Sequence, residues 1–128
     1  MILNNKIKIF LALASFMMAL AISLGAFGAH GLKSILDEYM LKIYHTGVEY
    51  HFYNTFGLFI ATFLYALKPN SKKIYIAIWL IIIGMCIFSF SLYLLAILSM
   101  PILGAITPIG GSLLIIAWLT LTYGILKD

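Results

Sequence analysis

The chain has 128 residues, of which 64% are hydrophobic and only 9% are charged, and its length leaves room for one small domain. Soluble domains carry about 25% charged residues, so a chain this apolar cannot cover itself with a water-compatible surface, and lipid must be the solvent for most of it. The net charge of +4 reflects an excess of lysine, since the chain has no arginine; here that excess predicts orientation in a membrane and contact with anionic lipid, and it excludes nucleic acid as a partner.

The first predicted membrane span covers residues 7–29, with Lys6 and Lys8 at its start. A cleaved signal peptide is the alternative, because basic residues followed by an apolar run and small residues also describe a signal sequence. The apolar run is longer than the roughly 7 to 15 residues of a signal core, and the segment "GAFGAHG" lacks an A-x-A cleavage pattern. A retained span is therefore the favoured interpretation.

Small residues recur at every fourth position near the end of this span, at Ala21, Gly25 and Ala29. On a helix this spacing places them on one face, where small side chains let two helix backbones approach closely in lipid. We expect this stripe to pack against another helix of the same chain. The alternative is a seam between two copies of the chain.

Residues 32–43 follow an amphipathic pattern. Apolar side chains repeat there at helical spacing, at Leu32, Ile35, Leu36, Tyr39, Met40 and Ile43. Charged residues occupy the other side, and Glu38 and Lys42 form a favourable i,i+4 pair. The segment is too short and too charged to span, so it predicts an amphipathic helix that lies in the membrane interface or caps the bundle's own end.

Three further apolar stretches predict spans over residues 47–67, 74–99 and 108–126, the first two separated by the polar loop "KPNSKK". In the third predicted span of the chain, the hydroxyls of Ser89, Ser91 and Tyr93 can bond to backbone or to a neighbouring helix. The elements together predict an all-α integral membrane protein, a four-transmembrane-helix bundle with one short amphipathic interfacial helix.

The start of the last span has two interpretations. Thr107 is a good N-cap residue, and Pro108 fits the first helical position, where its missing N–H costs nothing. The alternative is a kinked helix that begins at Leu103 and contains Pro108. The capped start is the favoured prediction.

Lysine distribution predicts the orientation. With four spans, six lysines share the side that holds both termini and the 68–73 loop, and two lie on the other side, at Lys33 and Lys42, beside Asp37 and Glu38. The excess of lysine marks the cytoplasmic side, so both termini are predicted to be cytoplasmic. An aromatic belt at that face is predicted from Tyr65, Tyr75, Trp79, Trp118 and Tyr123.

A polar cluster is predicted near the opposite face, formed by His30, His45, Glu49, His51 and Asn54. An ionisable group inside a membrane is costly and suggests function. The favoured interpretation is a hydrogen-bonded plug between the first two spans; a proton- or ion-responsive site and a metal site are the alternatives, although zinc needs three or four converging ligands. We expect no metal, no cofactor and no enzymatic activity, because the sequence has no HExxH, nucleophile elbow or glycine-rich phosphate loop.

Four segments resemble one known family: "LGAFGAH" (24–30), "YHTGVEYHFYN" (44–54), "SLYLLA" (91–96) and "GAITPIGG" (104–111). Over essentially its whole length the chain resembles the domain of unknown function 423 family, small bacterial inner-membrane proteins related to the transmembrane protein 256 group. The resemblance implies a multi-pass protein of the bacterial inner membrane and supplies no biochemical activity. Relatives commonly carry "YHxxH" at the head of the second span, whereas here His51 is followed by Asn54, which puts any role of that second histidine in doubt.

The favoured function is therefore a structural or accessory membrane component, whose partners are the lipid bilayer and either further copies of the chain or a larger membrane protein. The alternative is a small oligomeric transporter or channel with a proton- or ion-responsive Glu/His cluster near the outer face. The third and fourth predicted spans lack the internal charge that most transport pathways show, which favours the first function.

Overall fold

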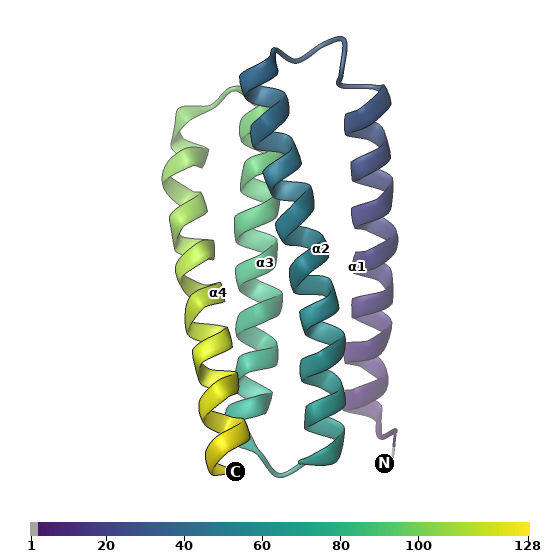
Figure 1. The fold of residues 1–128 in the computed structure, drawn as a ribbon, viewed down its shortest axis with the longest axis vertical. Helices are drawn as coiled ribbons and strands as arrows, with labels where there is room; N and C mark the ends of the chain where they lie inside the picture. Colours follow the sequence, from purple (N-terminus) through teal and green to yellow (C-terminus); the bar gives the residue numbers. More distant parts are fainter. Residues whose placement is uncertain (1–2) are drawn as a thin grey trace.

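The computed structural model describes residues 3–128, and over this range the chain folds into four helices, α1 (Asn5–His30), α2 (Glu38–Leu67), α3 (Lys72–Leu98) and α4 (Pro101–Lys127). Consecutive helices run antiparallel (Figure 1), so the start of α1 and the end of α4 lie beside the connection between α2 and α3. We call this the lysine end of the bundle. The other two connections lie at the opposite end, called the far end.

Three helices are long and apolar enough to cross a membrane, namely α1, α3 and α4, with mean hydropathies of 2.3, 2.6 and 2.0. The prediction of an all-helical, strongly apolar protein is confirmed. The remaining helix, α2, is the longest at 30 residues. It carries Glu38, Lys42 and Glu49 in its first half, which makes it less apolar than the other three.

The predicted amphipathic helix over residues 32–43 is wrong. Residues 31–37 form a non-helical connection, and α2 begins at Glu38 and continues without a break to Leu67. Asp37 sets this start, because its side chain accepts a hydrogen bond of 2.8 Å from the Met40 N–H, as an N-cap does. The predicted apolar face does not exist either: Leu32 is buried, whereas Tyr39 is 70% exposed.

The predicted N-cap at Thr107 is also wrong, and the helix begins six residues earlier in the chain, at Pro101. Proline is favoured at the first position of a helix because its missing N–H would have no partner there. Pro108 lies inside α4, as in the alternative prediction of a helix that contains it. The Thr107 hydroxyl bonds to the Leu103 carbonyl at 3.1 Å and to Ser91 of α3 at 2.6 Å.

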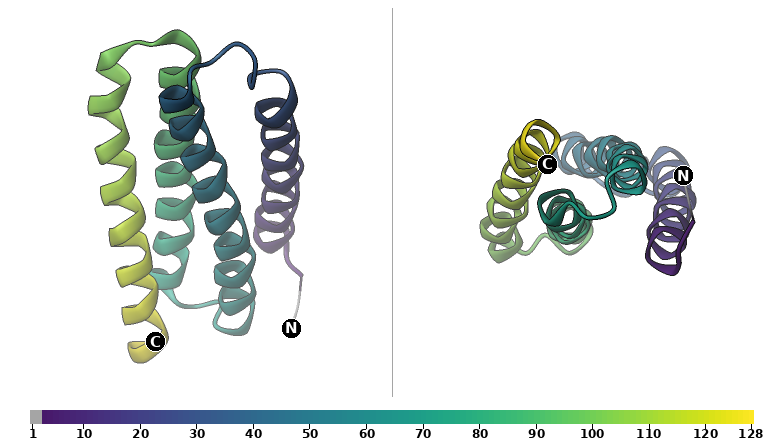
Figure 2. Two further views of the ribbon diagram at one scale, coloured as in Figure 1. Left: turned by 45° about the horizontal axis from the view of Figure 1, so that its top comes forward. Right: turned by 90° about the horizontal axis from the view of Figure 1, so that it is seen from below.

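Helices that are adjacent in sequence pack against one another, and seen along the bundle α3 lies between α2 and α4, with α1 outside α2 (Figure 2). The contact between α3 and α4 is the most extensive. Gly110 makes it close: a Cβ at this position would lie 2.4 Å from the backbone nitrogen of Phe88. Glycine is the residue that permits such backbone approach in lipid.

The core has two parts. The larger cluster of buried apolar side chains extends from the lysine end to the middle of the bundle and includes Ile7, Phe10, Ile78 and Leu121. The smaller one lies toward the far end and contains Leu32, Tyr44, Val48, Tyr93 and Ala96. The buried polar side chains described next are attached to this smaller cluster or lie between the two.

Candidate functional site

The structure does not bring the five residues of the predicted polar cluster together. His51 and Asn54 are buried inside the bundle, whereas His30, His45 and Glu49 are exposed. His45 and Glu49 do share one face of α2, as their i,i+4 spacing requires, but that face points away from the core. Over residues 3–128, no three histidine, cysteine or acidic side chains lie close enough to hold a metal ion.

His51 is fully buried and pairs with Tyr93 of α3, with 2.8 Å between Nδ1 and the phenol oxygen. Its other ring nitrogen, Nε2, has no hydrogen-bond partner. If the phenol donates to Nδ1, then Nε2 carries the ring proton and is a buried donor without an acceptor. In the other tautomer, Nε2 is an acceptor without a donor. Either way Nε2 makes no hydrogen bond of normal geometry, and the backbone of Met17 in α1 is the further polar group that interacts with the ring.

Tyr44 extends this contact to the first helix. Its hydroxyl donates to the Leu24 carbonyl of α1 at 2.5 Å, and its ring lies 5.1 Å from the ring of Tyr93. Gly28 of α1 gives the ring its space, since a Cβ there would come within 2.4 Å of it. Tyr44, His51 and Tyr93 thus form one buried set that joins α1, α2 and α3, which we call the tyrosine–histidine set.

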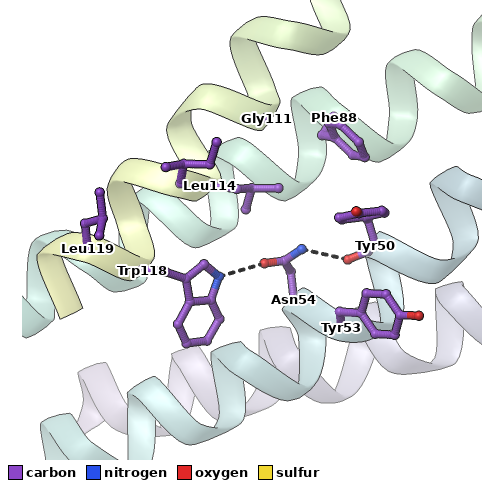
Figure 3. Close-up of a pocket in the computed structure, with 9 residues that line it drawn as sticks. Tyr50, Tyr53, Asn54, Phe88, Gly111, Leu114, Trp118 and Leu119 are labelled. Atoms are coloured by element: carbon purple, nitrogen blue, oxygen red, sulfur yellow. Dashed lines mark hydrogen bonds between the residues drawn. The ribbon is translucent and has the colours of Figure 1, made fainter. Parts of the chain in front are cut away.

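Asn54 makes the contact between α2 and α4. Its side-chain oxygen accepts a hydrogen bond of 3.1 Å from the Trp118 indole N–H, and its amide nitrogen donates to the Tyr50 carbonyl at 2.8 Å (Figure 3). The indole ring fits against Gly57, where a Cβ would lie 2.2 Å from it. Trp118 was predicted to belong to an interfacial belt; it is a half-buried contact between helices instead.

A lateral groove of about 610 Å³ lies beside this contact, bounded by α2, α3 and α4. The lining is apolar and rich in aromatic rings, and consists of Tyr50, Tyr53, Asn54, Phe88, Gly111, Leu114, Ile115, Trp118 and Leu119. The rings of Tyr50 and Phe88 lie 4.9 Å apart and close one end, while the Tyr53 hydroxyl points away from Asn54 (Figure 3).

The predicted packing stripe on α1 is only partly in contact with a neighbour. Ala21 is buried and Gly25 packs on Val48 of α2, where a Cβ would be at 3.4 Å. Ala29 is exposed, and Gly28 takes the contact instead. The sequence did offer Gly28 as a candidate for this contact, because it follows Gly25 by three residues. Positions three and four residues apart both fall on one face of a helix.

Several interhelical contacts involve residues outside the predicted site, and the predicted roles of Ser91 and Tyr93 in hydroxyl pairing agree with the structure. Ser89 is different, because its buried hydroxyl has no partner. The available signal for all three was the same: polar side chains inside an apolar run need a partner in the bundle. What the sequence could not supply was the identity of that partner.

The lysine end is tied together by the last residue of the sequence. The Ser71 hydroxyl and the Lys73 ammonium group both donate to the Asp128 carboxylate, and Lys68 donates to the Ile125 carbonyl at 3.0 Å. The hydrogen bond from Ser71, followed by the contact with Lys73, lowers the pKa of the Asp128 carboxyl below its ordinary value of 3.8. This group of residues couples the connection between α2 and α3 to the end of α4.

Comparison with known proteins identifies the family of this chain. A model of the family described as "Protein of unknown function (DUF423)" matches residues 24–111. The chain belongs to this DUF423 family. The resemblance seen in the sequence is thereby confirmed, and "LGAFGAH" and "GAITPIGG" lie inside the matched range.

Relatives of this DUF423 chain are named as membrane proteins. The chain is 42% identical over 120 residues to "UPF0382 membrane protein YwdK" of Bacillus subtilis, and the match covers 94% of this chain and 98% of that protein. It is 40% identical over 127 residues to a "UPF0382 membrane protein" of Haemophilus influenzae, covering 98% of each. No solved structure matches the chain. Together with its apolar helices, these relatives identify the chain as a membrane protein.

Proposed function

We propose that this DUF423 protein is a structural or accessory component of the bacterial inner membrane, in which all four helices span the bilayer. The observation that supports a structural role is that several of its buried polar side chains form hydrogen bonds between helices. The tyrosine–histidine set, the Asn54–Trp118 hydrogen bond and the Ser91–Thr107 hydrogen bond each join one helix to another. Polar groups used in this way hold a bundle together, because each bond between helices replaces contact with lipid.

The packing of α2 supports a fourth span. A helix that lies alongside α1 on one side and α3 on the other, and has their length, shares their direction across the bilayer. Four spans put both ends of the chain on one side, and that is the side of six of the eight lysines. The lysine excess supports cytoplasmic termini.

Topology is tested by labelling single cysteines with a membrane-impermeant maleimide in a Cys86→Ala background. In intact cells we expect cysteines at positions 70 and 127 to be protected and a cysteine at position 37 to react. Reaction at 127 together with protection at 37 would mean that the orientation is reversed. Reaction at both 37 and 70 would mean that α2 does not cross.

The structural role is tested by purification in mild detergent and by flux assays in proteoliposomes. We expect a defined partner or further copies of the chain to co-purify, and a wild-type proton and cation flux no greater than that of empty liposomes. A flux that depends on the protein and disappears in Glu49→Gln would overturn the structural role.

That last outcome corresponds to the second candidate function, an oligomeric transporter. One observation favours it: Glu49 is exposed on a helix inside a membrane bundle, and no ion pair to it forms within residues 3–128. A carboxylate facing lipid is costly, and a second copy could shield it. Crosslinking in native membranes, compared between the wild type and Glu49→Gln, distinguishes an oligomer that uses Glu49 from one that does not.

A further inference from the structure

The lateral groove between α2 and α4 lies at the middle of the bundle. Gly111 and Leu119 mark its extent along α4 and follow Pro101 by roughly 15 and 27 Å of a helix about 40 Å long. If all four helices span, as proposed above, this depth corresponds to the centre of the hydrocarbon layer. The inference below rests on that arrangement.

The rim shows where the groove opens. Tyr53, Ile115 and Leu119 line it and are each at least 60% exposed, so its mouth is on the outer surface of the bundle, which faces lipid. Apart from Asn54 and the hydroxyls of Tyr50 and Tyr53, the lining is apolar. The side-chain oxygen and amide nitrogen of Asn54 are already bonded to Trp118 and to the Tyr50 carbonyl. A polar ligand at this depth would lose its hydrogen bonds to water and find few in exchange.

Volume restricts the occupant further. The groove holds about 610 Å³ and extends about 12 Å along α4. The end of a single extended hydrocarbon chain fits this space, and hydrocarbon chains are also what surrounds the mouth of the groove at this depth.

We propose that this groove binds the terminal part of one hydrocarbon chain of a bilayer lipid. The chain takes the place of direct packing between α2 and α4, whose only side-chain hydrogen bond is the one between Asn54 and Trp118 in the described part of the protein. Aromatic rings from α2, α3 and α4 form its walls. The site is specific for the apolar chain and not for a headgroup, because none of the residues that line the groove is charged.

Tryptophan fluorescence tests the proposal. The protein has two tryptophans, so Trp79→Phe leaves Trp118 in the groove and Trp118→Phe leaves Trp79 on an exposed face of α3. Each variant is reconstituted into phosphatidylcholine vesicles in which one chain is brominated either near its methyl end or near the glycerol. We expect bromine near the methyl end of the chain to quench Trp118 at least twofold more than bromine near the glycerol does.

Two glycines of α4 supply matched variants. Gly111 lines the groove, while Gly104 is exposed, has only Leu95 near it at 3.8 Å and lies outside the groove. In the Trp79→Phe background, Gly111→Leu should reduce the quenching of Trp118 by half or more, and Gly104→Leu should leave it unchanged. Circular dichroism checks that both remain helical, and Gly111→Ala, whose Cβ meets Phe88 only at an ordinary 3.5 Å, replaces Gly111→Leu if that variant fails to fold.

Each other outcome contradicts the proposal in a distinguishable way. If bromine quenches neither tryptophan, the protein is not embedded as proposed, and the four-span function fails with it. If Trp79 is quenched and Trp118 is not, the groove is closed or filled by protein, and crosslinking from position 115 would then identify a second copy. Equal quenching of Trp118 in the two leucine variants would mean that the quencher reaches the indole from outside the groove.

Discussion

Helix α4 faces two neighbours, and the two contacts are made in opposite ways. Against α3 the backbones themselves approach, because Gly110 allows the nitrogen of Phe88 to within 2.4 Å of where a Cβ would stand. Against α2 the backbones stay apart, and one indole from Trp118 reaches across to Asn54 and Gly57. In lipid, where apolar side chains gain little by leaving the solvent, close backbone packing and single hydrogen bonds are the two main means of association.

The comparison predicts that the contact with α3 tolerates no added atom. Gly110→Ala places a methyl group against backbone that cannot rotate away, and we expect a loss of about 1–3 kcal/mol in the free energy of unfolding. Thermal unfolding in detergent, followed by circular dichroism, measures this loss. Gly104→Ala on the same helix is the control and should be close to neutral. Equal melting temperatures for the two variants would mean that α3 and α4 are not in backbone contact.

On the other side of α4, the same substitution should be less costly. Gly57→Ala also produces a collision, at 2.2 Å, but with the ring of Trp118, which can move into the adjacent groove. We expect a loss of about 1 kcal/mol, smaller than for Gly110→Ala, and a change in the emission of Trp118 in the Trp79→Phe background. If Gly57→Ala is the more destabilising of the two, the description of α2–α4 as the adaptable contact is incorrect.

A double-mutant cycle isolates the hydrogen bond between α2 and α4. Asn54→Leu, Trp118→Phe and the double variant should give a coupling energy of about 0.6 kcal/mol, the average for hydrogen bonds within membrane bundles. The same cycle on His51→Leu and Tyr93→Phe provides the comparison between a partly buried hydrogen bond and a fully buried one. Coupling near zero in the first cycle would leave α2 and α4 held only through α3.

The smallest effect is expected at the lysine end and depends on pH. Because the folded-state pKa of Asp128 is lowered, its contribution to stability is present above the ordinary value of 3.8 and is lost as the pH falls through the lowered pKa. The melting temperature of the wild type should therefore exceed that of Asp128→Asn at neutral pH and converge with it in acid. Asp37→Asn retains a good capping residue and should show no such convergence. A difference that persists unchanged in acid would contradict the assigned contacts.

Most of the fold was predictable because lipid leaves few alternatives. Long apolar runs must be helices, and the lysines and Pro69 show where they stop, so the positions of α1 and α3 follow from composition. The errors lie where two local signals competed. Thr107–Pro108 resembles a helix start as closely as Pro101 does, and only the contact of Thr107 with Ser91 decides between them. Asp37 was likewise assigned to the polar face of the predicted helix over residues 32–43, whereas it is the N-cap residue of α2.

The candidate site was less predictable, for a geometric reason. Depth along a helix can be counted from the sequence, and His45, Glu49 and His51 are indeed within two turns of one another. Direction is set by packing, and it turned His51 inward and Glu49 outward. The partners Tyr93 and Trp118 follow 42 and 64 residues after the side chains they meet. No local pattern could have paired them.

These separations in sequence have a consequence for the synthesis and membrane insertion of the protein. Membrane helices leave the ribosome in order, and at about 5–20 residues per second Tyr93 emerges roughly 2–8 s after His51. During that interval α2 holds a histidine and an asparagine whose partners do not yet exist. The least apolar of the four helices, α2, is thus synthesised before α3 and α4, which carry the hydrogen-bond partners of its buried polar side chains. If α2 spans the bilayer as proposed, we expect its insertion to be complete only after α3 and α4 have been synthesised.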